Sequence, residues 1–271
     1  MSAAIHPLAV IASGAVIGDG CTIGPFCCIG PDVRLGPGCR LHEHVVVDGR
    51  TTVGAGCQFY SFACIGKQTQ DLKWQGGTAF VEIGPRTTLR EYVTVHASSF
   101  DGGKTVVGAD CSILAYSHIA HDCLIGNQVV MSNGCQMAGH VTVEDQVVFG
   151  GLAGVVQFAR IGRLAMVGAM AKAVQDITPF TLVEGAPAEP RIINKIGMER
   201  AGLSAAAIQA MHQTFKLFFR SGLPVAQALA KIEAEFPGLP EVAHFVAFVR
   251  TAKHGVARPS TVVAAARVPA A

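Results

Sequence analysis

A run of residues spaced by six dominates the first two thirds of the chain. From residue 5 to residue 65, an aliphatic or aromatic residue stands at every sixth position without a gap. These positions, called slots below, are Ile5, Ile11, Ile17, Ile23, Ile29, Leu35, Leu41, Val47, Val53, Phe59 and Ile65. A period of six fits neither a helix of about 3.6 residues per turn nor a plain alternating strand. It predicts a parallel β-helix in which each hexad forms one short strand and one turn.

The slots continue beyond two interruptions. They resume in phase at Ile83 and end near Ala173, and the interruptions lie at about 67–80 and 98–104. Since neither interruption shifts the phase, each is expected to occupy whole hexads and to project outward as a loop. Loops on a rigid scaffold are frequent places for binding and catalysis.

The last third of the chain follows a different pattern. Residues 189–255 carry apolar residues at helical spacing, with Ser204 as an N-cap, and predict a small α-helical domain. Residues 256–271 are rich in Ala, Val and Pro and are expected to form a disordered tail. Residues 1–188 are assigned to the β-helix and its irregular end. Regular strands are expected to stop at three prolines, Pro179, Pro187 and Pro190.

Composition excludes several classes of protein. The formal net charge of +2 gives no field for nucleic acid. Gly or a polar residue interrupts every apolar run before it is long enough to span a membrane, and no signal peptide is visible, so we expect no transmembrane segment and a cytoplasmic location.

Seven of the nine cysteines lie two positions before a slot, which favours core packing over disulfides or a metal. They are Cys21, Cys27, Cys39, Cys57, Cys111, Cys123 and Cys135.

Coil arithmetic brings five residues to one patch. If three hexads close one coil, His121 lies one coil from Gly139 and two from Gln157, and Asp122 lies one coil from His140. Neighbouring coils are about 4.8 Å apart. A histidine beside a carboxylate, with a glycine N–H nearby, offers a general base, an orienting group and an oxyanion donor. A single histidine on a turn is more often simply solvated, but this column favours a catalytic site.

Several motifs resemble those of one enzyme family, the bacterial UDP-N-acetylglucosamine acyltransferases of lipid A biosynthesis. The segment Tyr116-Ser117-His118-Ile119-Ala120-His121-Asp122-Cys123 resembles the family's His-Ile-Ala-His-Asp-Cys segment, and the resemblance covers roughly residues 5–255. It is also carried by Gln70-Asp71-Leu72-Lys73, Ile23-Gly24-Pro25-Phe26, His44-Val45-Val46-Val47, Ala138-Gly139-His140-Val141 and Arg220-Ser221-Gly222.

The resemblance implies a left-handed β-helix, a homotrimer and a reaction without metal or cofactor. The implied reaction moves a 3-hydroxyacyl group from acyl carrier protein to the 3-hydroxyl of UDP-N-acetylglucosamine. His121 matches the general base, Asp122 its supporting carboxylate, and the Gly139 N–H the oxyanion donor. Ala169 matches a position that limits the length of the acyl chain. The substrate-binding residues assigned on this basis are Gln70, Asp71, Lys73, His96, His118, His140 and Gln157, with Asn194 and Arg200 near the nucleotide.

Three positions depart from the family pattern. Trp74 stands where the family usually has Tyr, Val156 where a His commonly precedes Gln157, and Ile196 where an acidic residue is usual. The Val156 departure leaves open whether the acceptor sugar carries a 3-hydroxyl or a 3-amino group. Four basic residues are candidates to receive an acidic carrier protein, with plain solvation as the alternative: Arg191, Lys195, Lys216 and Arg220.

Other functions remain open at this point. The related N-acyltransferase of the same pathway carries an extra N-terminal domain, for which slots beginning at Ile5 leave no room. A zinc hydratase of the same fold would use histidines shared between subunits, and the histidine spacing matches it poorly. A non-catalytic scaffold is disfavoured by the intact set of His121, Asp122 and Gly139.

Overall fold

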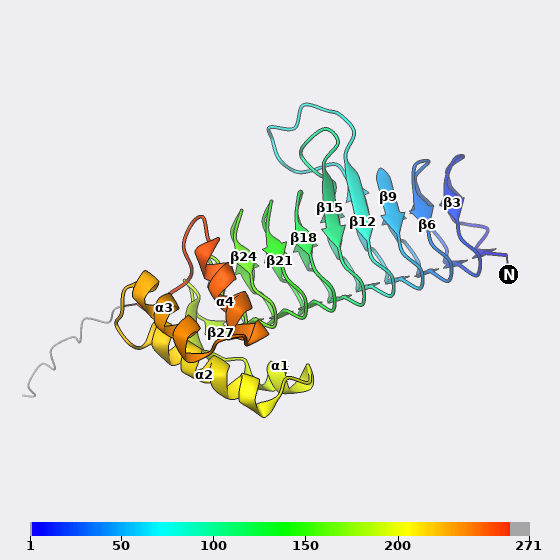
Figure 1. Cartoon of the computed structure of the whole chain (residues 1–271). Coiled ribbons are helices and arrows are strands. Elements are labelled where there is room, and N and C mark those ends of the chain that lie inside the picture. The colour runs from blue at the N-terminus through cyan, green and yellow to red at the C-terminus, as the bar shows by residue number, and fades with distance from the viewer. Residues whose placement is uncertain (1, 261–271) are drawn as a thin grey trace, which may run out of the picture.

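The chain folds as a long three-sided coil followed by four helices (Figure 1). This computed structural model describes residues 2–260. Successive short strands pass from sheet A to sheet B to sheet C and back to A, so each sheet runs along the whole coil. The coil is left-handed. In Figure 1 the strands of sheet C face the viewer and run downward, away from the two loops, while the chain as a whole advances from right to left. The turns between sheets are called the A–B, B–C and C–A corners.

The three sheets contain 28 strands in the described part of the chain. Sheet A holds β1 (Ala4–Ile5), β4 (Thr22–Ile23), β7 (Arg40–Leu41), β10 (Gln58–Phe59), β13 (Thr88–Leu89), β16 (Ser112–Ile113), β19 (Val130–Met131), β22 (Val148–Phe149), β25 (Met166–Val167), β27 (Thr181–Glu184) and β28 (Glu189–Ile193). Sheet B holds β2 (Val10–Ile11), β5 (Cys28–Ile29), β8 (Val46–Val47), β11 (Cys64–Lys67), β14 (Thr94–His96), β17 (His118–Ile119), β20 (Gln136–Met137), β23 (Gly154–Val155) and β26 (Lys172–Ala173). Sheet C holds β3 (Val16–Ile17), β6 (Arg34–Leu35), β9 (Arg50–Val53), β12 (Phe80–Ile83), β15 (Lys104–Val107), β18 (Leu124–Ile125), β21 (Thr142–Val143) and β24 (Arg160–Ile161).

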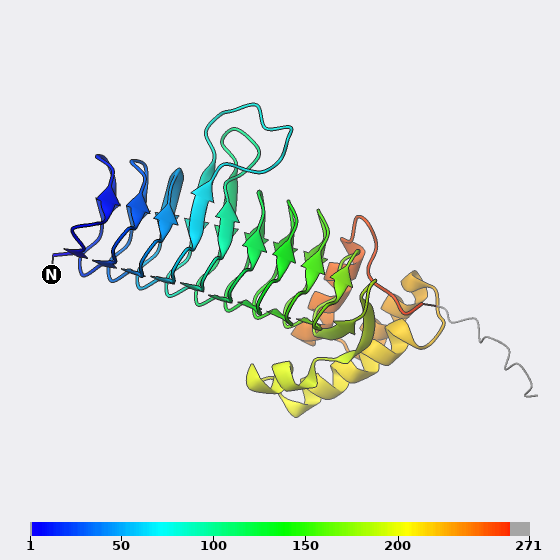
Figure 2. The ribbon, with the colours of Figure 1, turned by 180° about the vertical axis from the view of Figure 1, so that it is seen from behind.

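The register of the strands follows from the hexads. Ile5 pairs with Ile23, three hexads later, as it must if three hexads make one coil. Across the first interruption Val53 pairs with Ile83, five hexads later, and across the second Leu89 pairs with Ile113, four hexads later. Both separations are whole numbers of hexads, so the core pattern survives the two insertions. The loops are residues 68–79 (loop 1) and 97–103 (loop 2), and both project from the B–C corner (Figure 2).

Slot side chains and the residues two positions before them fill the interior of the coil. All seven cysteines predicted to point inward are buried, which confirms their packing role. Their thiols also donate weak hydrogen bonds to carbonyls of the wall, as Cys123 Sγ does to Ala138 O at 3.1 Å. One continuous apolar core therefore runs along the coil.

The prediction that regular strands stop at the three prolines is wrong. β27 lies between Pro179 and Pro187 and pairs in parallel with β25, and β28 contains Pro190 and pairs antiparallel with β27. Because β28 is the last strand of sheet A, its outer edge needs no further ladder donor and tolerates a proline. Sheet A therefore extends beyond residue 188.

Four helices close the C-terminal end of the coil. They are α1 (Lys195–Arg200), α2 (Ala205–Phe219), α3 (Val225–Glu235) and α4 (Pro240–Arg250). The Ser204 side chain accepts from Ala207 N and caps α2, as predicted. The apolar faces of the helices form a second core with Leu164 and Phe180 of the coil. No helix among residues 2–260 has the length and apolarity needed to cross a bilayer.

The segment after α4 is not a free tail at its start. Val256 and Ala257 are buried, and Val256 forms a bridge with Asp176 of the coil. The prediction of a disordered segment from residue 256 is therefore wrong for its first residues, because two apolar side chains find a place against the coil. Residues 261–271 lie outside the described part of the chain.

A largely buried ion pair within the coil is linked to α4 through its arginine. Arg160 Nε lies 2.7 Å from Asp176 Oδ2, whose side chain is only 3% exposed. The same guanidinium donates to Phe248 O at 2.8 Å and lies over the Phe248 ring. Loss of Asp176 would leave the Arg160 charge with no carboxylate at this junction.

We expect Asp176→Ala to lower the free energy of unfolding by about 3 kcal/mol, because breaking a buried pair leaves an uncompensated charge. Glu233→Ala is the matched control, since it breaks the exposed Arg250–Glu233 pair, 2.7 Å long, and should change stability by less than about 1 kcal/mol. Equilibrium urea unfolding of both variants measures the difference. Equal losses would contradict the structural role of the junction.

Candidate active site

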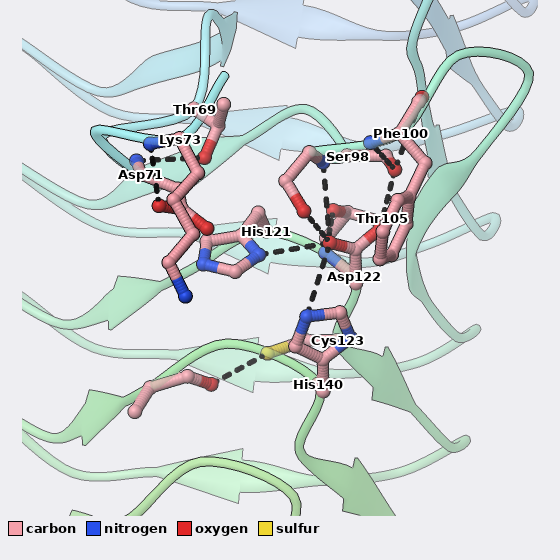
Figure 3. A network of polar contacts seen from close by, with 12 residues as sticks. Thr69, Asp71, Lys73, Ser98, Phe100, Thr105, His121, Asp122, Cys123 and His140 are labelled. Atoms are coloured by element: carbon pink, nitrogen blue, oxygen red, sulfur yellow. Dashed lines mark hydrogen bonds and ion pairs between the residues drawn. The ribbon is translucent and has the colours of Figure 1, made fainter.

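His121 and Asp122 lie at the B–C corner, in the turn between β17 and β18. Both loops leave the coil at this same corner, one and two coils earlier, and fold over the pair (Figures 1 and 3). Asp122 has a φ of 60°, and His140, one coil further, has a φ of 61°. Left-handed backbone is tolerated by Asp and His more readily than by most residues, and it turns these two side chains toward one point.

The two side chains form a hydrogen-bonded dyad. His121 Nδ1 lies 2.8 Å from Asp122 Oδ2, and the two side chains are 7% and 8% exposed. When Asp122 is ionised, His121 must carry its proton on Nδ1 to make this bond. Nε2 is then the free basic nitrogen of the ring. The dyad thus has the arrangement of a general base with its orienting carboxylate.

Asp122 is surrounded by donors from loop 2 (Figure 3). The Ser98 hydroxyl donates to Oδ1, while the Ser99 N–H and hydroxyl donate to Oδ2 at 3.1 and 2.6 Å. The backbone N–H of Asp122 donates to Thr105 Oγ1 at 2.8 Å. Burial by itself would raise the pKa of Asp122, but the hydrogen bonds from Ser98, Ser99 and His121 outweigh it and hold the pKa below its usual range. Asp122 is therefore a fixed anion at neutral pH.

Gly139 lies directly against the His121 ring. A methyl group at this position would collide with the imidazole of His121. Only glycine therefore allows the coil that carries residue 139 to stack on the coil that carries His121 with the ring in this place. Within residues 2–260, the Gly139 N–H donates no hydrogen bond, unlike that of His140, which donates to His121 O at 3.0 Å. A free N–H thus lies next to the base.

A cavity of about 730 Å³ opens in front of His121. Loop 1 contributes Gln70, Asp71 and Lys73 to its wall, sheet B contributes His96 and His118, and the next coils contribute Gly139, Val156 and Gln157. A second hollow of about 450 Å³ shares Asp71, Lys73, His121 and Gln157 with the first and adds His140, Trp74, Phe100 and Phe158. The structure thus brings together nearly all site residues that the sequence analysis proposed on loop 1 and the coils.

The histidines around the dyad are held neutral by their surroundings. Burial lowers the pKa of His118 to about 4, with smaller contributions from the charges of His96 and His121. Burial also lowers the pKa of His96, and it lowers that of His140 although Asp122 Oδ2 lies 3.6 Å from its Nε2. His118 Nδ1 shares a hydrogen bond of 2.7 Å with Thr94 Oγ1. Around neutral pH these rings therefore offer hydrogen bonds rather than positive charge.

Three proposed residues do not reach this cavity within one chain. Asn194 is the N-cap of α1; it accepts from Gly197 N at 3.1 Å and donates to Leu164 O at 2.9 Å. With Arg200 and Ile196 it lines a separate hollow of about 490 Å³ on the sheet A side. Ala169 is exposed at the A–B corner, between β25 and β26.

The dyad is poorly suited to a metal ion. Nitrogen or oxygen atoms of His121, Asp122 and His140 lie within 4.8 Å of one another, and they form the one such trio among residues 2–260. The hydroxyls of Ser98 and Ser99 and the His121 ring already occupy the Asp122 oxygens. A cation would have to displace these donors, so the donor set fits a hydrogen-bonded dyad better than a zinc site.

Sequence reasoning did not identify the loop 2 serines. It expected loop 2 to project outward but gave no partner for it, because hexad arithmetic does not describe residues inside an insertion. The only available signal was the position of loop 2, one coil from Asp122. Thr94 was missed for a different reason: an outward threonine on a strand is common and carries no motif.

Comparison with known proteins shows which family shares the sequence and fold of this chain. Residues 176–257 match the model for domain 2 of UDP N-acetylglucosamine O-acyltransferase, and residues 2–31, 14–49 and 104–139 match that of the bacterial transferase hexapeptide repeat. The acyl-[acyl-carrier-protein]–UDP-N-acetylglucosamine O-acyltransferase of Anaeromyxobacter sp. strain Fw109-5 is 44% identical over 94% of this chain and 100% of its own length. That of Verminephrobacter eiseniae is 41% identical over 94% and 99%.

Solved structures agree with these sequence relatives. The UDP-N-acetylglucosamine O-acyltransferase of Moraxella catarrhalis superposes with a TM-score of 0.89 at 35% identity, covering 94% of this chain and 99% of that one. The Francisella novicida UDP-N-acetylglucosamine acyltransferase gives 0.90 at 31% identity, with 95% of each chain covered. Identity at this level over nearly the whole length shows that the chain belongs to the UDP-N-acetylglucosamine O-acyltransferase family.

Proposed function

We propose that the chain transfers a 3-hydroxyacyl group from acyl carrier protein to the 3-hydroxyl of UDP-N-acetylglucosamine, with His121 as general base. O-acylation of UDP-N-acetylglucosamine from acyl carrier protein is the activity of its family and opens lipid A biosynthesis. The observation that carries the assignment of the base is the dyad: a buried histidine with its proton fixed on Nδ1 and its Nε2 free.

The proposed reaction uses three groups at the B–C corner: the His121 imidazole, the Asp122 carboxylate and the Gly139 N–H. His121 Nε2 takes the proton from the sugar hydroxyl as its oxygen attacks the thioester carbon. Asp122 stabilises the imidazolium that forms, since it stays ionised. The Gly139 N–H stabilises the negative oxygen of the tetrahedral intermediate. Collapse of the intermediate breaks the carbon–sulfur bond, and the imidazolium returns its proton to the leaving thiolate.

Loop 1 supports binding of the nucleotide sugar. Asp71 Oδ1 accepts from Lys73 N at 2.9 Å, and Thr69 Oγ1 accepts from Asp71 N at 3.1 Å, so local hydrogen bonds stabilise the turn that carries Lys73. No ion pair engages the Lys73 ammonium within residues 2–260, and this charge suits a substrate phosphate. The neutral His96 and His118 suit sugar hydroxyls.

We expect His121→Ala to reduce acyl transfer by at least about 10²-fold, the usual scale for loss of a general base. His244→Ala is a matched control, because His244 also pairs with a carboxylate, Glu144, at 2.7 Å, but lies on α4 away from the cavity. A thioester-release assay with purified acyl carrier protein measures both variants. Near-normal activity of His121→Ala would remove His121 from the mechanism.

We further propose that three chains assemble and that each active site lies between two of them. Asn194 and Arg200 lie away from the dyad of their own chain, so they can contact a nucleotide bound there only from a neighbour. A column of stacked aromatic rings at the A–B corner also supports assembly. Neighbouring rings are 4.8–5.0 Å apart, and the column consists of Phe26, His44, Phe62, Tyr92 and Tyr116. Its phenylalanines and tyrosines are 44–62% exposed. An exposed aromatic strip of this length is typical of an interface.

Complementation between variants tests the shared site. At limiting UDP-N-acetylglucosamine, His121→Ala and Arg200→Ala are each expected to lose at least about tenfold in rate. When the two variants are co-expressed in equal amounts, about a quarter of the sites in random trimers pair an intact His121 with an intact Arg200 from the neighbour. Activity should then rise to roughly that fraction of the wild-type rate. Activity no higher than the average of the two parents would place the whole site within one chain.

Ala169 is proposed to limit the length of the acyl chain. It lies at the A–B corner more than two coils from His121, and in a trimer the walls of one cleft come from different faces of neighbouring chains. Residues from the two faces can therefore line one groove. The alternative is an alanine that simply packs between subunits. A small side chain here leaves room for a fairly long tail, somewhat shorter than glycine would allow.

Ala169→Gly should move the preferred acyl chain to a longer one and Ala169→Met to a shorter one, since each methylene excluded from the groove forfeits about 0.8 kcal/mol. Initial rates with carrier proteins bearing acyl chains of graded length measure the optimum. An unchanged optimum in both variants would exclude Ala169 from chain selection.

A further inference from the structure

Loop 2 contains two serines that contact the dyad only through its carboxylate. Ser98 is fully buried, and its hydroxyl donates to Asp122 Oδ1. Ser99 donates twice to Asp122 Oδ2, from its N–H and its hydroxyl. Neither serine is hydrogen-bonded to His121. The hydrogen bonds of these two residues therefore reach the dyad at Asp122, and Figure 3 shows Ser98 beside it.

We propose that Ser98 and Ser99 are positioning residues that hold Asp122 on His121 and keep it from turning to His140. This inference rests on the proposed role of His121 as the base. The two histidines compete for one oxygen: His121 Nδ1 is 2.8 Å and His140 Nε2 is 3.6 Å from the same Asp122 Oδ2. A carboxylate free to rotate could bond either ring, whereas one fixed at both oxygens keeps the shorter contact.

Loop 2 is built so that the Ser98 hydroxyl has one position. It accepts from Phe100 N at 3.0 Å, and the nearest acceptor for its own hydrogen is Asp122 Oδ1, with Phe100 O farther away at 3.5 Å. A methyl group on Gly103 would collide with this hydroxyl, so the return of the loop has no room for a side chain there. The tip is fixed in turn, because Asp101 Oδ1 accepts from Thr78 N at 2.7 Å in the stem of loop 1.

The electrostatic consequence of removing the serines has a definite sign. They stabilise the ionised carboxylate, and without them a buried Asp122 becomes a stronger proton acceptor. The dyad then binds a proton at higher pH and the base is lost earlier on acidification. The other charged or titratable groups that line the cavity and the adjoining hollow stay unchanged in this comparison; they are His96, His118, His140, Asp71, Asp101, Lys73 and Lys172.

The experiment measures kcat/KM against pH for Ser98→Ala and Ser99→Ala in the full-length protein. We expect each variant to lose about tenfold in kcat/KM, the scale of a hydrogen bond to a charged group, and the acid limb of its profile to move to higher pH. KM for UDP-N-acetylglucosamine should stay unchanged. Ser99→Thr keeps the hydroxyl and should restore both the rate and the limb.

Two comparisons separate positioning from folding. Ser61→Ala is the matched control, because the Ser61 hydroxyl donates to a carboxylate, Glu43, at 2.6 Å at another corner of the coil; its profile should not move. Ser99, which is less buried than Ser98, provides a second test if Ser98→Ala does not fold. A reduced rate with an unmoved acid limb in Ser99→Ala, or a Ser99→Thr variant as impaired as Ser99→Ala, would overturn the proposal. Failure of the base assignment gives a different result, an active His121→Ala.

Discussion

The ladder that pairs each strand with the strand one coil later, always a whole number of hexads along the chain, is the constraint on which the rest of the structure depends. From Cys21 onward, each hexad of the coil buries its slot residue and the residue two positions before it, and the next coil stacks on both. A shift of one residue would turn polar corner residues inward and break the ladder. The two loops are tolerated only because they add whole hexads, and their stems are pinned by β11, β12, β14 and β15. A rigid corner therefore carries the site.

The rigidity of this corner explains how a buried dyad can exist there. Asp122 lies in a left-handed turn, largely out of solvent, and an isolated carboxylate in such a place would bind a proton. Loop 2 prevents this by supplying donors to both oxygens. The neighbouring His118 and His96 stay neutral because burial opposes their charge. The site thus keeps one fixed anion and one base, with hydrogen-bonding rings around them.

The same architecture explains why the residues of the site are divided between faces. The dyad and loop 1 belong to the B–C corner, whereas Asn194 and Arg200 line a hollow against sheet A, and Ala169 lies at the A–B corner. A three-sided coil cannot bring its own corners together. The exposed aromatic column at the A–B corner supports the view that neighbouring chains do so. On this proposal, assembly and catalysis depend on the same geometry.

The sequence by itself determined the coil, the inward cysteines and the patch of His121, Asp122 and Gly139, because a strict period converts residue number into position in space. It could not determine what the insertions do: Ser98 and Ser99 reach Asp122 through the path of loop 2, which no period describes. Nor could it place β28 or the buried Val256, since an edge strand and a packed chain end depend on surfaces that exist only after the coil has formed. Contacts within the repeat join residues one coil apart, so they follow directly from the spacing of those residues in the sequence. Contacts made by loops and ends depend on the tertiary fold, which alone decides them.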